Sequence, residues 1–197
     1  MIKSLLKSYE SLQRQKHAFL SRVAGLSTSQ LHFRQVPGSW SVSDILDHLV
    51  KVEKELLTAV KAELPNGTAR GLRDGIGAIF IIGVMLWPMR VKAPASASAL
   101  LPQTTAVPAK TALRWTEVRT EMADLLGRLR TDQLGCGLFR HPVSGWMTIQ
   151  QALTFLSAHI QHHTYQLNRL MSAMRNIQTE ATTEFSGESG KKRRVTT

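Results

Sequence analysis

Apolar residues recur at helical spacing in four long segments of the chain, at about residues 2–23, 41–64, 111–130 and 148–171. Because residues three or four positions apart share one face of an α-helix, each segment presents an apolar stripe that must be buried. Few stretches alternate apolar and polar residues, and only 6% of the residues are aromatic, so a sheet is not indicated. The pattern therefore predicts an all-α protein built as a four-helix bundle.

Two of these segments begin with residues that typically cap a helix. Ser41 precedes the second helix and Asp44 follows three positions later, as in a capping box. Thr148 and Gln151 repeat this arrangement at the start of the fourth helix. Since an N-cap satisfies backbone N–H groups that the helix leaves free, the two pairs indicate where these helices begin. Asp44 is accordingly interpreted as a helix cap in preference to an acid–base group.

Residues 64–110 form a long connection between the second and third helices, which we expect to act as a crossover or lid. The connection contains an apolar run at 75–89, which is shorter than the ~20 residues of a membrane-spanning helix and is interrupted by Pro88. Its apolar side chains would form too large a patch in water, so we expect a buried helix or a hydrophobic lid over a pocket. Contact with an anionic membrane is the less favoured alternative.

Cysteine content and charge restrict the class of protein. The single cysteine, Cys136, excludes an intrachain disulfide framework and a cysteine-based zinc site. Residues 1–20 lack the apolar core of a signal peptide, so we expect a cytoplasmic protein. The net charge is +11, but the basic residues form no Arg-rich helix, and nucleic-acid binding is not expected. We expect one domain at residues 1–179 and a disordered basic tail at 180–197.

Three histidines lie close together on the fourth helix, at His159, His162 and His163. Positions i and i+4 are about 40° apart around a helix, so His159 and His163 share the apolar face. His162 lies about 100° from His163, toward the edge of that face, and we favour a position at a pocket rim for it. His48 borders the apolar face of the second helix. These positions allow three inward histidines to converge between facing helices, where bundles commonly hold metals.

A histidine on an apolar face is more often a hydrogen-bonded core residue than a metal ligand. An inward pair at i and i+4, together with a third inward histidine on another helix, favours a divalent metal site over that structural interpretation. Three protein ligands would leave one position open for water or substrate, as in catalytic sites.

Two stretches of the sequence resemble the DinB-like superfamily, which is also described as DinB/YfiT-like metalloenzymes. They are VPGSWSVSDILDHLVKVE and HPVSGWMTIQQALTFLSAHIQHHTYQLNRL. The resemblance covers about residues 1–175 and is weakest in the middle segment. The residues that match the family pattern are Trp40, Ser41, Asp44, His48, His141, Pro142, Gly145, His159, His163 and Gln166.

The resemblance implies a four-helix bundle that holds a divalent metal, most often zinc or nickel, on His48, His159 and His163. It also implies a small-molecule substrate and a transferase or isomerase reaction that uses a low-molecular-weight thiol such as bacillithiol or mycothiol, or else hydrolysis. Candidate catalytic residues are His162, His141 and Gln166, of which Gln166 could orient a ligand. A homodimer is expected, because dimerisation through the helices is common in the family. The alternative is a non-catalytic metal-binding or structural bundle that associates with anionic surfaces.

Overall fold

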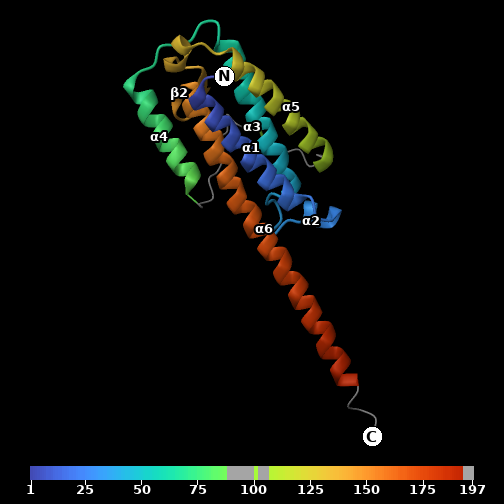
Figure 1. Cartoon of the computed structure of the whole chain (residues 1–197). Coiled ribbons are helices and arrows are strands. Elements are labelled where there is room, and N and C mark those ends of the chain that lie inside the picture. Colours follow the sequence, from blue (N-terminus) through green and yellow to red (C-terminus); the bar gives the residue numbers. More distant parts are fainter. Residues whose placement is uncertain (88–99, 102–106, 193–197) are drawn as a thin grey trace.

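The computed structural model describes the backbone of residues 1–87, 100–101 and 107–192, with side chains as far as residue 179. Four long helices lie side by side (Figure 1). They are α1 (Lys3–Val23), α3 (Val42–Glu63), α5 (Pro108–Arg128) and α6 (Ile149–Lys192). The predicted all-α four-helix bundle is therefore confirmed. The short elements are α2 (Thr28–His32), α4 (Leu72–Leu86), the 3₁₀ helix η2 (Thr131–Gly135), β1 (Phe139–His141) and β2 (Gly145–Met147).

One ion pair between α3 and α5 is buried in the bundle interior. Arg119 Nε donates to Glu53 Oε2 and Arg119 Nη2 donates to Glu53 Oε1, both at 2.6 Å, and each side chain is only 1% exposed. Two parallel charge-assisted hydrogen bonds of this kind fix both position and direction. The pair therefore holds α3 in register with α5.

Both predicted capping boxes are present. Ser41 Oγ accepts a hydrogen bond from the backbone N–H of Asp44, and the Asp44 carboxylate accepts from the Ser41 N–H at 2.8 Å. The side chains of Thr148 and Gln151 make the same two bonds at the start of α6. Asp44 also forms an ion pair with Arg34 at 2.7 Å. Its carboxylate is fully engaged in holding the start of α3, as the interpretation of Asp44 as a cap requires.

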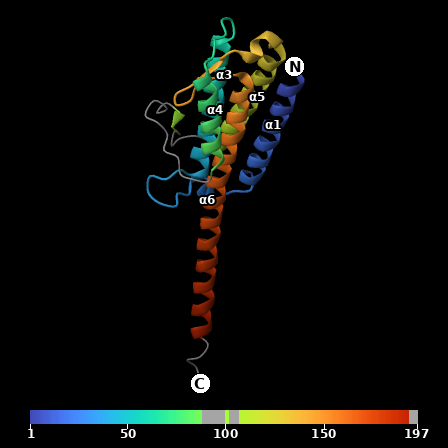
Figure 2. The ribbon, with the colours of Figure 1, turned by 90° about the vertical axis from the view of Figure 1, so that its left-hand side faces the viewer.

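The apolar run within the predicted crossover is largely a helix, α4, which packs against α6 and β2 (Figure 2). Its inner face buries Ala78, Ile81 and Met85. Gly77 allows the close approach, because a Cβ at this position would lie 2.5 Å from the carbonyl oxygen of Ser144. None of the described helices has the length and apolar character that crossing a membrane requires. Residues 88–99 and 102–106 of the predicted crossover lie outside the described residues.

A small antiparallel hairpin lies between η2 and α6, although the sequence did not indicate a sheet. Strands β1 and β2 pair in the register Phe139↔Met147 and His141↔Gly145. Gly145 has φ +79°, a left-handed conformation that a side chain would strain. Asp74 joins the hairpin to α4, since its carboxylate accepts hydrogen bonds from the backbone N–H groups of Trp146 at 3.0 Å and Gly71 at 2.8 Å.

The last helix is longer than predicted. Its C-terminal half extends beyond the other helices, and it continues to Lys192, into the segment predicted to be disordered (Figures 1 and 2). Propagation adds one hydrogen bond for each residue fixed, so a helix nucleated in the bundle can continue into a polar stretch. Residues 193–197 lie outside the described residues, and the domain boundary at 179 stays a prediction.

Candidate metal centre

His48 from α3 meets His159 and His163 from α6 inside the bundle. The Nε2 atom of His159 lies 3.1 Å from His48 Nε2 and 3.2 Å from His163 Nε2. All three side chains are buried. Among the described residues, this is the one group of three or more His, Cys, Asp or Glu side chains whose ligand atoms lie within 4.8 Å of one another. The three residues predicted from the sequence are therefore brought together.

The distances from His159 Nε2 to the other two Nε2 atoms fit a tetrahedral metal ion. A zinc ion bonded to nitrogen at ~2.0–2.1 Å separates its ligand atoms by ~3.3 Å, the edge of the tetrahedron. The two closest Nε2–Nε2 distances are 3.1 and 3.2 Å. Three imidazole ligands without a carboxylate suit zinc or nickel better than magnesium or calcium.

Hydrogen bonds on the far side of two rings leave the inner nitrogens free to bind. His48 Nδ1 lies 2.8 Å from the carbonyl oxygen of Leu100, which can only accept, so this nitrogen carries the proton. His163 Nδ1 lies 3.0 Å from Gln166 Oε1 and donates to it in the same way. In each ring the Nε2 lone pair is then directed at the shared centre. Partners of this kind orient metal-binding histidines in known sites.

Burial keeps the three rings neutral. Loss of solvent lowers the pKa of His48, and it lowers the pKa of His159 and of His163 well below the ordinary value of 6.5. For His159 and His163 the neighbouring histidines are the next cause, since each would repel a second positive charge. Neutral rings keep the lone pairs that a metal ion needs.

Two aromatic side chains wall the centre and fix its rings. Trp40 stacks on His163 with ring centroids 5.7 Å apart and an angle of 11°, and it also contacts His48 at 4.8 Å. Phe155 stacks on His159 at 5.7 Å. Trp40 matches the family pattern, although no role was predicted for it, and Phe155 was not predicted. The position of Phe155, four residues before His159 on the same helical face, was the available signal.

His162 differs from the expectation of a rim position, because its side chain is only 7% exposed. Burial lowers its pKa, whereas hydrogen bonding to the backbone at Trp87 and Met85 acts in the opposite direction. Its Nδ1 is buried and has no hydrogen-bond partner among the described residues. His162 lines the same cavity as Met85 of α4, beside the metal centre but outside the set of three.

His141 is the last residue of β1, next to the turn of the hairpin, and its ring contacts Phe155 with centroids 4.9 Å apart. Its Nδ1 accepts hydrogen bonds from the backbone N–H groups of Val143 at 3.2 Å and Ser144 at 3.3 Å. The proton of the neutral ring is therefore on Nε2. Burial lowers the pKa of His141, which favours this neutral form. A ring held in this state can donate a hydrogen bond but has no free lone pair with which to act as a base.

The three metal-site histidines, His141, His162 and Gln166 all line one cavity of about 710 Å³. Its walls are mostly apolar and include Val52, Ile81 and Phe139. Gln35, Glu55 and Arg169 are polar or charged residues of the lining. The size and lining are typical of a site for a small, largely apolar molecule.

Comparison with known proteins assigns the chain to a family and agrees with its fold. The sequence profile of the DinB superfamily matches residues 11–167, so the chain belongs to this superfamily. The fold is similar to the solved structure of YfiT from Bacillus subtilis, which is described as a probable metal-dependent hydrolase with an unusual four-helix bundle topology. The TM-score is 0.64, with 21% sequence identity over 88% of this chain and 90% of that chain. A comparison with curated proteins gave no match.

Proposed function

We propose that this protein is a metal-dependent hydrolase that acts on a small, largely apolar molecule. The observation that carries the proposal is the convergence of three neutral Nε2 groups, on His48, His159 and His163, in the wall of a cavity. A divalent ion bound there would lower the pKa of a coordinated water and so supply a nucleophile near neutral pH. The similarity to YfiT, itself described as a probable metal-dependent hydrolase, supports this choice of reaction.

The chain's own residues would position the substrate. The apolar walls of the cavity would exclude water from the reacting group and bind the apolar part of the molecule. His141 would donate its Nε2–H to an oxygen of the substrate, because its Nδ1 is already occupied by two backbone N–H groups. Gln166 would act through His163 by fixing the direction of its ring.

A thiol-dependent transfer is the competing reaction that family resemblance implies, since the same open position could hold a thiolate. Both reactions share the metal site and differ in the nucleophile. The test therefore compares turnover of a panel of short-chain nitrophenyl esters and thioesters with and without an added thiol. Tag-free protein is required, because a polyhistidine tag binds metal.

We expect hydrolysis without added thiol, loss of hydrolysis on chelation, and recovery when zinc or nickel is restored. His159→Ala should abolish turnover while the far-UV circular dichroism spectrum is kept. His17→Ala is the matched control, because His17 is exposed on α1 and remote from the cavity lining. Turnover that occurs only with added thiol would show that the reaction is a thiol-dependent transfer and not a hydrolysis. Turnover that is indifferent to both chelator and His159→Ala would overturn the metal-dependent function.

A further inference from the structure

We propose that the ligand of the large cavity is an amphiphile, an apolar chain or ring with an oxyanion group that binds at Arg169. Beside this cavity lies a second hollow of about 460 Å³, which we call the Arg169 groove. Its lining consists of Gln35, Asn168, Arg169, Ser172, Ala173 and Asn176. Gln35 and Arg169 also line the large cavity, so the two hollows adjoin. The oxyanion, a carboxylate or a phosphate, would occupy the groove while the apolar part lies in the cavity.

The Arg169 groove is polar, in contrast to the mostly apolar cavity beside it. None of its described lining residues carries a carboxylate. Arg175 Nη2 donates to Ser172 Oγ at 3.0 Å, which brings a second guanidinium group to the edge of the groove. The planar fork of an arginine matches two oxygens of a carboxylate or phosphate. Since a guanidinium has five N–H donors, Arg169 can bind an oxyanion and a neighbouring protein group at the same time.

Gln166 adds hydrogen-bond donors between the metal centre and the groove. Its Oε1 accepts from His163 Nδ1 at 3.0 Å, so the remaining polar group of its side chain is the NH₂. Gln166 lines the cavity and lies three residues before Arg169, so the two side chains are neighbours on one face of α6. A ligand that extends from the centre into the groove therefore meets N–H donors, which require acceptor oxygens.

The groove fixes the direction in which such a ligand would lie. Arg169 is six residues beyond His163 on α6, which is about 9 Å along the helix axis. Helix α3 runs in the opposite direction to α6 (Figure 1). Glu55, the acidic residue of the cavity lining, is seven residues beyond His48 on α3, about 10 Å toward the other end. The positive and negative side chains therefore flank the metal centre from opposite ends. An oxyanion at Arg169 leaves the apolar part of the ligand at the centre and in the cavity.

The substrate class that follows is an apolar molecule with a carboxylate or phosphate about 9 Å from the bond that is cleaved. Calling this ligand the substrate rests on the proposed function, whereas its binding requires no turnover. Oxyanion binding without hydrolysis would contradict the proposed reaction alone. Hydrolysis without a preference for oxyanions would contradict the role of the groove alone.

The test is isothermal titration calorimetry of the full-length, tag-free chain with octanoate, octyl phosphate and octanamide at pH 7.5. These probes share an eight-carbon chain and differ in the head group. We expect one molecule bound per chain, with the preferred oxyanion at least ten-fold tighter than octanamide. The tighter of the two oxyanions identifies the head group. Hexanoate should bind about ten-fold more weakly than octanoate, because two fewer CH₂ groups enter the apolar cavity.

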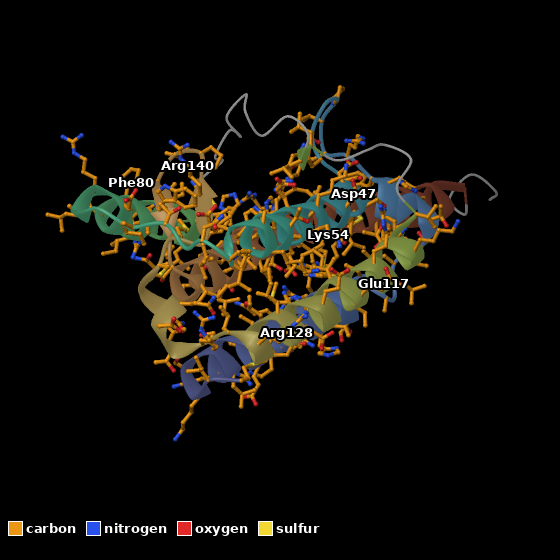
Figure 3. The ribbon with its side chains drawn as sticks, turned by 90° about the horizontal axis from the view of Figure 1, so that it is seen from above. Asp47, Lys54, Phe80, Glu117, Arg128 and Arg140 are labelled. Atoms are coloured by element: carbon orange, nitrogen blue, oxygen red, sulfur yellow. The ribbon has the colours of Figure 1, made fainter. Side chains whose placement is uncertain are left out.

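Substitutions in the groove assign the preference to Arg169. Arg169→Gln should weaken oxyanion binding about ten-fold and leave octanamide binding within about two-fold. Asn168→Asp adds a negative charge to the groove without a change of shape and should act in the same direction. Arg128→Gln is the matched control, since Arg128 is exposed on α5 and lies on the other side of the bundle from Arg140 (Figure 3). It removes one positive charge and should leave all four affinities unchanged.

An oxyanion preference that is unchanged in Arg169→Gln would place the oxyanion on the metal ion and overturn the proposal. Equal affinities for the oxyanions and octanamide, or no oxyanion binding at millimolar concentration, would also overturn it. Circular dichroism checks that each variant is folded. Should Arg169→Gln lose its helical signal, the isosteric Asn168→Asp decides, and unchanged oxyanion binding in that folded variant would contradict a site in the groove.

Discussion

The Nε2 atoms of His48 and His159 lie 3.1 Å apart, although the two residues are separated by 111 positions in the chain. His163 Nε2 approaches the same His159 atom to 3.2 Å. The Nε2 atoms of His48 and His163 are acceptors, because each ring carries its proton on Nδ1. A proton on His159 Nε2 could satisfy only one of these two contacts. A shared cation satisfies all three nitrogens, which is the physical basis of the metal-site account.

The first prediction concerns the tautomer of His141. Long-range ¹H–¹⁵N NMR spectra at pH 7 should show a neutral ring protonated on Nε2, assigned by the signals missing from His141→Asn. The asparagine side-chain oxygen of that variant can accept hydrogen bonds from the N–H groups of the turn, so the melting temperature should be unchanged. The variant also loses the Nε2–H that would donate to the reacting oxygen of the substrate, so kcat should fall by up to roughly 10²-fold. A charged ring, or a proton on Nδ1, would remove the proposed donor role.

The second prediction is the pH dependence of stability in the presence of chelator. Because burial holds the pKa of His48, His159 and His163 below 6.5, the unfolded chain binds more protons than the folded chain as the pH falls through this value. Above pH 6.5 the three histidines are neutral in both states and do not lower the free energy of unfolding. Below pH 6.5 the free energy of unfolding decreases, until the pH reaches the pKa values of the folded chain. Urea unfolding at pH 7.5, 6.5 and 5.5 should therefore show a decreasing free energy of unfolding. His159→Ala should reduce the slope, and an equal slope in this variant would place its origin elsewhere.

The third prediction concerns the buried pair of Glu53 and Arg119. Glu53→Ala leaves the guanidinium buried without its carboxylate, which should cost about 3–5 kcal/mol in the free energy of unfolding. Glu121→Ala serves as the control, because Glu121 pairs with Lys54 and Lys61 on the exposed surface. Chemical denaturation should detect a large loss only for Glu53→Ala. Similar small losses in both variants would show that the buried pair does not hold α3 on α5.

The fourth prediction concerns the extension of α6. Truncation after Thr179 should leave the melting temperature within about 2 °C, on the scale where ~1 kcal/mol moves a domain of this size by a few degrees. The circular dichroism signal at 222 nm should fall, because residues 180–192 are helical. An unchanged signal would support the disordered tail expected from composition, and a large drop in melting temperature would show that the extension docks on the bundle.

Local and periodic features were predictable from the sequence. The hydrogen bonds between Ser41 and Asp44 depend only on the spacing of three residues between them. The inward direction of His159 and His163 follows from helical geometry. His48 was a candidate partner because it borders the apolar face of the second helix, and the resemblance to the family indicated the same residue. These features depend little on how distant segments pack.

Features that depend on distant packing were not predictable. The burial of His162 arises from α4, whose glycines weaken the helical signal of its sequence. The tautomer of His141 depends on the hairpin turn, because its two donors are backbone N–H groups of that turn. The exposure of Ile79 and Phe80 on α4 was also not predicted. An apolar sequence indicates that its side chains should be covered, but it does not say by which surface.

The most direct test of the account is the metal content of tag-free protein, measured by inductively coupled plasma mass spectrometry after removal of loosely bound ions. The account predicts one divalent ion per chain, lost in His48→Ala and in His163→Ala and largely retained in His162→Ala. Protein that holds no divalent ion even after incubation with zinc or nickel would contradict it. So would metal that persists in His163→Ala but is lost in His162→Ala, because the ligand set would then be wrong.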